Sequence, residues 1–150
     1  MTDDGLNIDE RRQKLADTFG RELDPLKRYH EKFESAGVDP FELFFEESLN
    51  PDNPDESTQG NWERTFKQWR SYMADQGRHP ACPNETHVKG FIRHLRANHE
   101  DGGRNNNAST VKQKLHRLNR TFEYWQNEAE FPHERDYNPI RTARQKVSIS

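Results

Sequence analysis

The chain has 150 residues, which is enough for one domain or for a small domain preceded by an arm. Only 29% of the residues are hydrophobic, 33% are charged, and the formal net charge is −3. No run approaches the roughly 18 apolar residues that a membrane-spanning helix needs, so we expect no membrane segment. The first residues are acidic and polar rather than basic and then apolar, so we expect no secretory signal and a cytoplasmic protein. The single cysteine, Cys82, excludes a disulfide framework.

The net charge hides a strong asymmetry along the chain. Residues 1–60 hold 7 Lys or Arg and 16 Asp or Glu, a balance of −9. Residues 61–150 hold 16 Lys or Arg and 10 Asp or Glu, a balance of +6, and six of the seven histidines. An acidic piece followed by a basic piece indicates an anionic partner for the second piece only. Charge scatter in a polar protein is the alternative.

The acidic piece is predicted to form a helical arm and a linker, residues 1–56. Residues 9–35 are predicted to form one long helix with a narrow apolar stripe, ended by Gly37 and Pro40. The stripe consists of Leu15, Phe19, Leu23, Leu26, Tyr29 and Phe33. A short helix follows at 39–45, with Asp39 as its N-cap, and residues 50–56 are predicted to form the linker because they hold two prolines and no apolar residue.

Beyond residue 56, three segments have the periodicity of amphipathic helices. The first begins at Ser57 or Thr58 and ends at Gly77, the second begins near Asn84, and the third begins at Ser109. Their apolar positions are Trp62, Phe66, Trp69 and Met73, then Val88, Phe91, Ile92 and Leu95, then Val111, Leu115, Leu118, Phe122 and Trp125.

The segments around these helices complete the predicted fold. Residues 99–107 form a polar loop for which we expect no packing, and a short last element begins at Asn138. No segment shows the period-two alternation of a half-buried strand. The sequence therefore predicts an all-α protein.

The third helix has the clearest functional pattern. From Arg104 to Arg120 the chain holds five Lys or Arg and no acid. On a helical wheel the apolar positions fall within about 80°. Gln113, His116, Arg117 and Arg120 lie on the opposite side, with Lys112 and Lys114 beside the apolar seam. Such a stripe suits a DNA major groove, where Gln and Arg bond base edges and Lys neutralises phosphate. The alternative is a solvated polar face on an ordinary helix.

Several pieces, taken in order, resemble the N-terminal core-binding (SAM-like) domain of tyrosine recombinases, the phage integrase, Xer and Cre group. The first is Thr58 with the aromatic positions of the first helix, and the second is His87–Leu95. The third is Ser109–Leu115 with Leu118 and Phe122, and the last is the Asn138-Pro139 pair. The resemblance covers about residues 57–141 and implies a compact four-helix core-binding bundle there, with a basic tail or linker over 142–150.

The resemblance also implies how the bundle is used. In that family this domain grips the major groove of the recombination site with its first and third helices. Carried over to this chain, the expected partner is double-stranded DNA, and the expected DNA-binding residues are Thr58, Asn61, Arg64, Ser109, Thr110, Lys112, Gln113, Lys114, Arg117 and Arg120. Gln113 and Arg117 follow from the wheel as well, whereas Thr58 and Asn61 come from the resemblance.

The catalytic domain of a tyrosine recombinase is not represented in residues 1–150. None of the four tyrosines has the context of its nucleophile, so we expect no catalysis by this chain. A truncated integrase, a separately encoded half and a stand-alone DNA-binding regulator all remain open, as does a helical protein-protein interaction module for which DNA is irrelevant.

Other chemistry is weakly indicated. His79, Cys82 and His87 have metal-like spacing, but a fourth ligand is not evident and prolines stiffen the segment, so we expect no metal. No Gly-rich phosphate loop follows a strand, so we expect no cofactor and no small-molecule substrate. The apolar stripe of the arm is expected to pack either on the bundle or on the arm of a second copy, giving a homo-oligomer.

Overall fold

A computed structural model describes residues 5–128 and 130–149, and in these ranges the chain is all helical, with no strand. The first half holds α1 (Ile8–Thr18), the 3-10 turn η1 (Lys27–Tyr29), α2 (His30–Ala36), α3 (Pro40–Phe44), the π-helical turn η2 (Phe45–Leu49) and the 3-10 turn η3 (Asn50–Asp52). The second half holds α4 (Glu56–Asp75), α5 (Glu85–Arg96), the 3-10 turn η4 (His99–Asp101), α6 (Ala108–Asn127) and α7 (Pro139–Lys146). The all-α prediction is confirmed.

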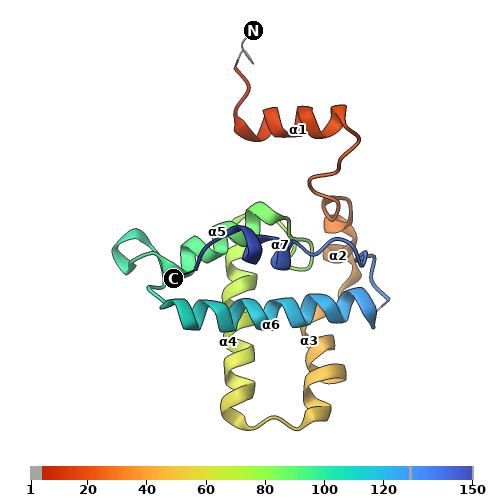
Figure 1. The fold of residues 1–150 in the computed structure, drawn as a ribbon. Coiled ribbons are helices and arrows are strands. Elements are labelled where there is room, and N and C mark those ends of the chain that lie inside the picture. Colours follow the sequence, from red (N-terminus) through yellow and green to blue (C-terminus); the bar gives the residue numbers. More distant parts are fainter. Residues whose placement is uncertain (1–4, 129, 150) are drawn as a thin grey trace.

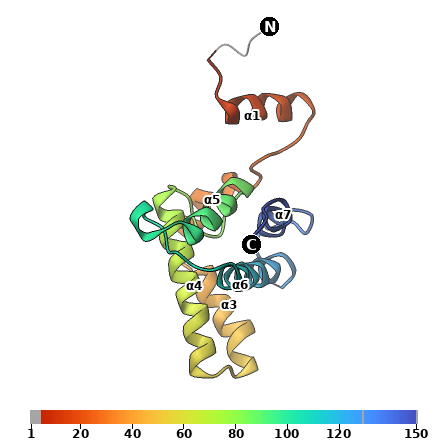
Figure 2. The same cartoon turned by 60° about the vertical axis from the view of Figure 1, so that its left-hand side comes forward.

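The prediction of one long helix over 9–35 is wrong, because the chain breaks in its middle. α1 ends at Thr18, and Gly20 then takes a left-handed conformation with φ of 65°. Pro25 follows, and because proline has no backbone N–H, it cannot donate the hydrogen bond to the carbonyl four residues earlier that a continuous helix needs. Helical structure resumes at η1, and α2 ends at Gly37 in the left-handed conformation, as the sequence predicts. α1 therefore lies at the edge of the molecule, joined to the rest by residues 19–26 (Figures 1 and 2).

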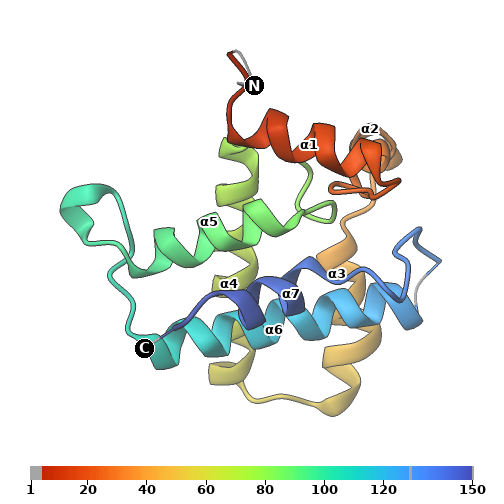
Figure 3. The same cartoon turned by 45° about the horizontal axis from the view of Figure 1, so that its top comes forward.

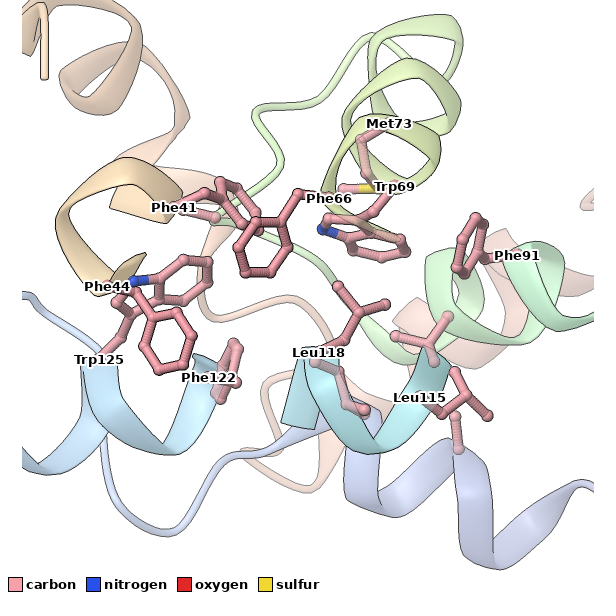
Figure 4. Packing of buried hydrophobic residues seen from close by; sticks show 14 of the residues in the cluster. Phe41, Phe44, Phe66, Trp69, Met73, Phe91, Leu115, Leu118, Phe122 and Trp125 are labelled. Carbon is pink, nitrogen blue, oxygen red and sulfur yellow. The ribbon is translucent and has the colours of Figure 1, made fainter. Parts of the chain in front are cut away.

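Residues of the acidic piece share one hydrophobic core with the three amphipathic helices. Leu26, Phe41, Phe44 and Leu49 are buried in the same cluster as Trp125. The Phe41 and Trp125 rings lie 5.0 Å apart between centroids, edge to face. Figure 4 shows Phe41 and Phe44 of α3 against the aromatic side chains of α4 and α6. The core thus runs across the boundary predicted after residue 56, and much of the predicted arm is packed on the bundle.

The three amphipathic helices form as predicted, with small shifts at their starts. α4 begins at Glu56 because the Asp55 carboxylate accepts from the Thr58 N–H at 2.7 Å and caps the helix. Every apolar position predicted for the three helices is buried. α6 crosses α4, and α3 lies beside the N-terminal half of α4 (Figures 1 and 3). Because the two helices cross, the polar face of α6 lies beside α4.

The predicted last element is α7, which packs on α5 and α6. Asn138 caps it, and Asn138 Nδ2 donates to Asn119 Oδ1 of α6 at 2.7 Å. Half of the segment predicted as a basic tail is therefore helix. Its cations are partly paired on the bundle, because Lys146 forms an ion pair with Glu85 at 2.6 Å.

Membrane insertion finds no support in the described helices. None of those in residues 5–128 and 130–149 is both long and apolar enough to cross a bilayer.

Candidate nucleic-acid interface

The N-terminal half of α6 presents a polar face to solvent. Asn107 caps the helix by accepting from the Thr110 N–H at 2.8 Å, so α6 begins at Ala108, one residue before the predicted start. Ser109, Lys112 and Gln113 are exposed, and Thr110 is partly buried. Gln113 and His116, which the helical wheel assigns to the outer face, are both exposed.

A shallow groove runs along this face beside α4. It has a volume of about 790 Å³, and we refer to it as the α4–α6 groove. Its lining residues are Trp62, Ala108, Ser109, Lys112, Gln113, His116, Arg117 and Arg120. The structure thus brings together five of the ten predicted DNA-binding residues, namely Ser109, Lys112, Gln113, Arg117 and Arg120. The other five, Thr58, Asn61, Arg64, Thr110 and Lys114, do not line this groove.

Arg117 is held in place from α4. Its Nη1 donates to the Thr65 hydroxyl at 3.2 Å, and that hydroxyl donates to the Asn61 carbonyl at 2.9 Å. Thr65 is fully buried. On the same side of α4, Arg64 Nη1 donates to Asn61 Oδ1 at 3.1 Å. The predicted residues Asn61, Arg64 and Arg117 are therefore joined across α4 and α6, although sequence reasoning did not identify Thr65 as the link.

Lys114 differs from the expectation of an exposed DNA contact, because its side chain is only 5% exposed. It lies three residues after Val111 and four before Leu118, which places it on the side of α6 that packs on the bundle. Its Nζ donates to Asn106 Oδ1 at 2.6 Å. Burial, followed by repulsion from Arg104, Arg64 and Arg117, lowers the pKa of Lys114 to about 8.

The loop before α6 is ordered, contrary to the expectation that it lacks packing. The N–H groups of Arg104, Asn105 and Asn106 donate to backbone carbonyls near the end of α5, at 3.0, 2.7 and 2.7 Å. These bonds satisfy carbonyls that the end of a helix leaves unpaired. Gly103 is buried so closely against Ala97 that a Cβ would lie 2.2 Å from the Ala97 carbonyl oxygen. The loop therefore holds Arg104 and Asn106 beside the start of α6.

The charges of Arg64, Arg104 and Arg117, which come from α4, this loop and α6, all act on Lys114 and lower its pKa, and we refer to these four residues as the cationic cluster. Burial and the charge of Arg64 also lower the pKa of Arg117. Among residues 5–128 and 130–149, no ion pair joins any of the four to a carboxylate. Sequence reasoning missed Arg104, although the adjacent Gly102-Gly103 pair signals a close approach of backbone to backbone.

Arg120 lies at the other end of the groove and forms an ion pair with a carboxylate. Its Nη2 lies 3.1 Å from Asp52 Oδ2, and its guanidinium lies 5.4 Å from the Trp62 ring centroid. Asp52 belongs to η3, so a carboxylate of the acidic piece reaches the groove.

The histidines and cysteine with metal-like spacing interact with the backbone. The N–H of Ala81 donates to His79 Nδ1 at 3.0 Å, and the N–H of Asn84 donates to His87 Nδ1 at 3.0 Å. Cys82 is buried, and burial raises the pKa of its thiol to about 12. In the part of the chain that the structure describes, no group of three or more His, Cys, Asp or Glu side chains is placed to hold a metal ion.

Comparison of the chain with protein-family models, with curated proteins and with solved structures gives no match in any of the three.

Proposed function

We propose that this chain binds double-stranded DNA with the α4–α6 groove and the cationic cluster. The observation that carries the proposal is the burial of Lys114 against the neutral amide of Asn106, with Arg64, Arg104 and Arg117 acting on its charge and no ion pair to a carboxylate from any of the four among the described residues. Keeping like charges together is unfavourable, so this arrangement favours a polyanion that neutralises them. By contrast, the largely buried Arg78 is paired with Asp24 at 2.7 Å.

The exposed and the fixed residues of this surface have different roles in the proposal. Lys112, Gln113 and His116 are exposed on one face of α6, and an α-helix fits the width of a major groove. Gln113 is placed to bond a base edge, and Lys112 to neutralise a phosphate. Arg117 is partly buried and held by Thr65, so its guanidinium meets DNA already oriented.

The finer proposal is that α4–α7 form a SAM-like core-binding domain of the tyrosine recombinase type. The support is the resemblance of residues 57–141 together with the observed order of four helices, the last starting at the Asn138-Pro139 pair. In this proposal the chain grips the recombination site during site-specific recombination or integration. We assign it no catalytic step, cofactor or small-molecule substrate.

A second candidate function is a protein-protein interaction, and the apolar face of α1 favours it. Leu15 is 60% exposed and Phe19 is 74% exposed, on a helix at the edge of the molecule (Figure 1). A helical interaction module, or a homo-oligomer formed through this helix, would cover these side chains. In either case the contact would use α1 and leave the α4–α6 groove free.

The test is binding of the full chain to a mixed-sequence duplex, measured by fluorescence anisotropy over a range of salt concentrations. We expect log K to fall linearly with log salt, with about 0.9 of slope for each phosphate neutralised. Gln113→Ala is expected to change the sequence preference more than the affinity, and Lys112→Ala the reverse. Absence of salt-dependent binding at low ionic strength would refute the proposal and favour the interaction module.

A further inference from the structure

Lys114 carries a charge that the fold does not compensate. The side chain is 5% exposed, and its one hydrogen-bond partner among the described residues is the neutral amide of Asn106. A buried ammonium without an anion costs free energy, and protein folds usually pair such a group with a carboxylate. The fold instead places Arg117 three residues further along α6, and Asn106, the partner of Lys114, also donates to the Arg104 carbonyl at 3.3 Å. The charges of Arg104, Arg64 and Arg117 all oppose that of Lys114.

The three arginines come from separate parts of the molecule, and Arg64 on α4 donates to Asn61 Oδ1 at 3.1 Å. Arg117 is held on α6 by Thr65. Arg104 is carried by a loop whose backbone is bonded to the end of α5, with Gly103 packed tightly against Ala97. The cluster is thus assembled by tertiary structure rather than by one basic helix face. It is also distinct from the α4–α6 groove, since Arg117 is the one residue of the cluster that lines that groove.

We propose that the cationic cluster is a binding site for a single phosphate group, with Arg64, Arg104 and Arg117 contacting its oxygens above the buried charge of Lys114. Guanidinium groups suit this ligand because they donate paired hydrogen bonds to phosphate oxygens. The inference deepens the proposed function, because the backbone of duplex DNA supplies such a group. Free phosphate has the same chemistry, so the test includes both.

The variants remove one charge each and leave the backbone unchanged. Lys114→Gln keeps a donor for Asn106 and removes the buried charge, and Arg104→Gln makes an exposed change that the fold tolerates. Lys32→Gln is the matched control, because Lys32 is exposed on α2 and belongs to no part of the proposed surface. Each full-length variant is measured in two ways. One is the salt slope of duplex binding, and the other is the melting temperature in inorganic phosphate against chloride at equal ionic strength.

We expect Lys114→Gln and Arg104→Gln to lower the magnitude of the salt slope by about 0.9, the value for one phosphate contact. We also expect phosphate to raise the melting temperature of the unaltered chain, since a ligand that binds the folded state stabilises it, and this rise to be lost in both variants. Lys32→Gln should match the unaltered chain in both measurements.

The two measurements separate the sources of the phosphate. A reduced slope without a phosphate-dependent melting shift assigns the site to the DNA backbone. A lost melting shift with an unchanged slope assigns it to free phosphate. If neither measurement changes in either variant while the unaltered chain binds duplex, the phosphate site is overturned and the proposed function stands. If the unaltered chain binds no duplex at all, the proposed function fails separately.

Discussion

Arg120 and Asp52, which are 68 positions apart in the chain, form an ion pair of 3.1 Å at the end of the α4–α6 groove. The pair joins a predicted DNA-binding cation to the acidic N-terminal piece. Both side chains are substantially exposed, so water and salt weaken the pair. Under the proposed function, Asp52 competes with a DNA phosphate for the same guanidinium.

Replacing Asp52 with Asn is expected to strengthen duplex binding. A surface ion pair contributes up to about 1 kcal/mol, so the affinity should rise by up to ~5-fold. The freed Arg120 should also raise the magnitude of the salt slope by about 0.9. The control is Glu46→Gln, which removes an exposed charge of η2. Equal effects of the two variants would mean that Asp52 acts only through net charge.

The link between Thr65 and Arg117 is tested with two buried threonines. Thr65→Val and Thr121→Val each remove a hydroxyl that donates to the carbonyl four residues earlier, at 2.9 Å in both cases. Both should lower the free energy of unfolding by about 1 kcal/mol. Only Thr65 also accepts from the Arg117 guanidinium, so only Thr65→Val should weaken duplex binding. Chemical denaturation and anisotropy measure the two effects, and equal loss of DNA binding would refute the link.

The pH dependence of binding reports on Lys114. Its pKa of about 8 implies that it loses its proton between pH 7 and 9, while Arg64, Arg104 and Arg117 stay charged. DNA affinity should therefore fall over this range in the unaltered chain, and Lys114→Gln should show little change. Stability should move in the opposite direction. The unfolded chain keeps this proton up to the ordinary Lys pKa and the folded chain releases it near pH 8, so rising pH favours the folded state.

Two phenylalanines test which part of the acidic piece belongs to the core. Phe44 is fully buried between α4 and α6, whereas Phe19 is 74% exposed. Phe44→Ala should cost about 3–5 kcal/mol of unfolding free energy. Phe19→Ala should stay within about 0.5 kcal/mol, as surface changes do. A small effect of Phe44→Ala would contradict a core shared across residue 56.

The amphipathic helices were predictable because each has a regular apolar stripe and a clear cap or glycine at its ends. The break after α1 was not predictable, because the apolar stripe keeps its helical spacing on both sides of Gly20 and many helices tolerate a single glycine. Phe41 and Phe44 could be recognised as apolar, but their packing on Trp62 and Trp125 depends on how α3 folds back. That contact joins residues far apart in the chain, and local periodicity carries no information about it.

The candidate site divides in the same way. Gln113 and Arg117 were found from the helical wheel, since a single helix places them on one face. The roles of Thr65, Arg104 and Asp52 depend on contacts between separate segments, and the burial of Lys114 depends on how α6 packs. Arg104 in particular is positioned by hydrogen bonds from its loop to the end of α5.

DNA binding by this surface is tested most directly by mapping the amide resonances of the full chain as duplex DNA is added and then displaced with salt. Binding through the α4–α6 groove and the cationic cluster predicts shifts concentrated in residues 61–68 of α4, in residues 104–106 and in the first half of α6, and these shifts reverse as salt rises. Shifts confined to α1 around Leu15 and Phe19, or none at low ionic strength, would contradict DNA binding by the α4–α6 groove and favour a protein partner.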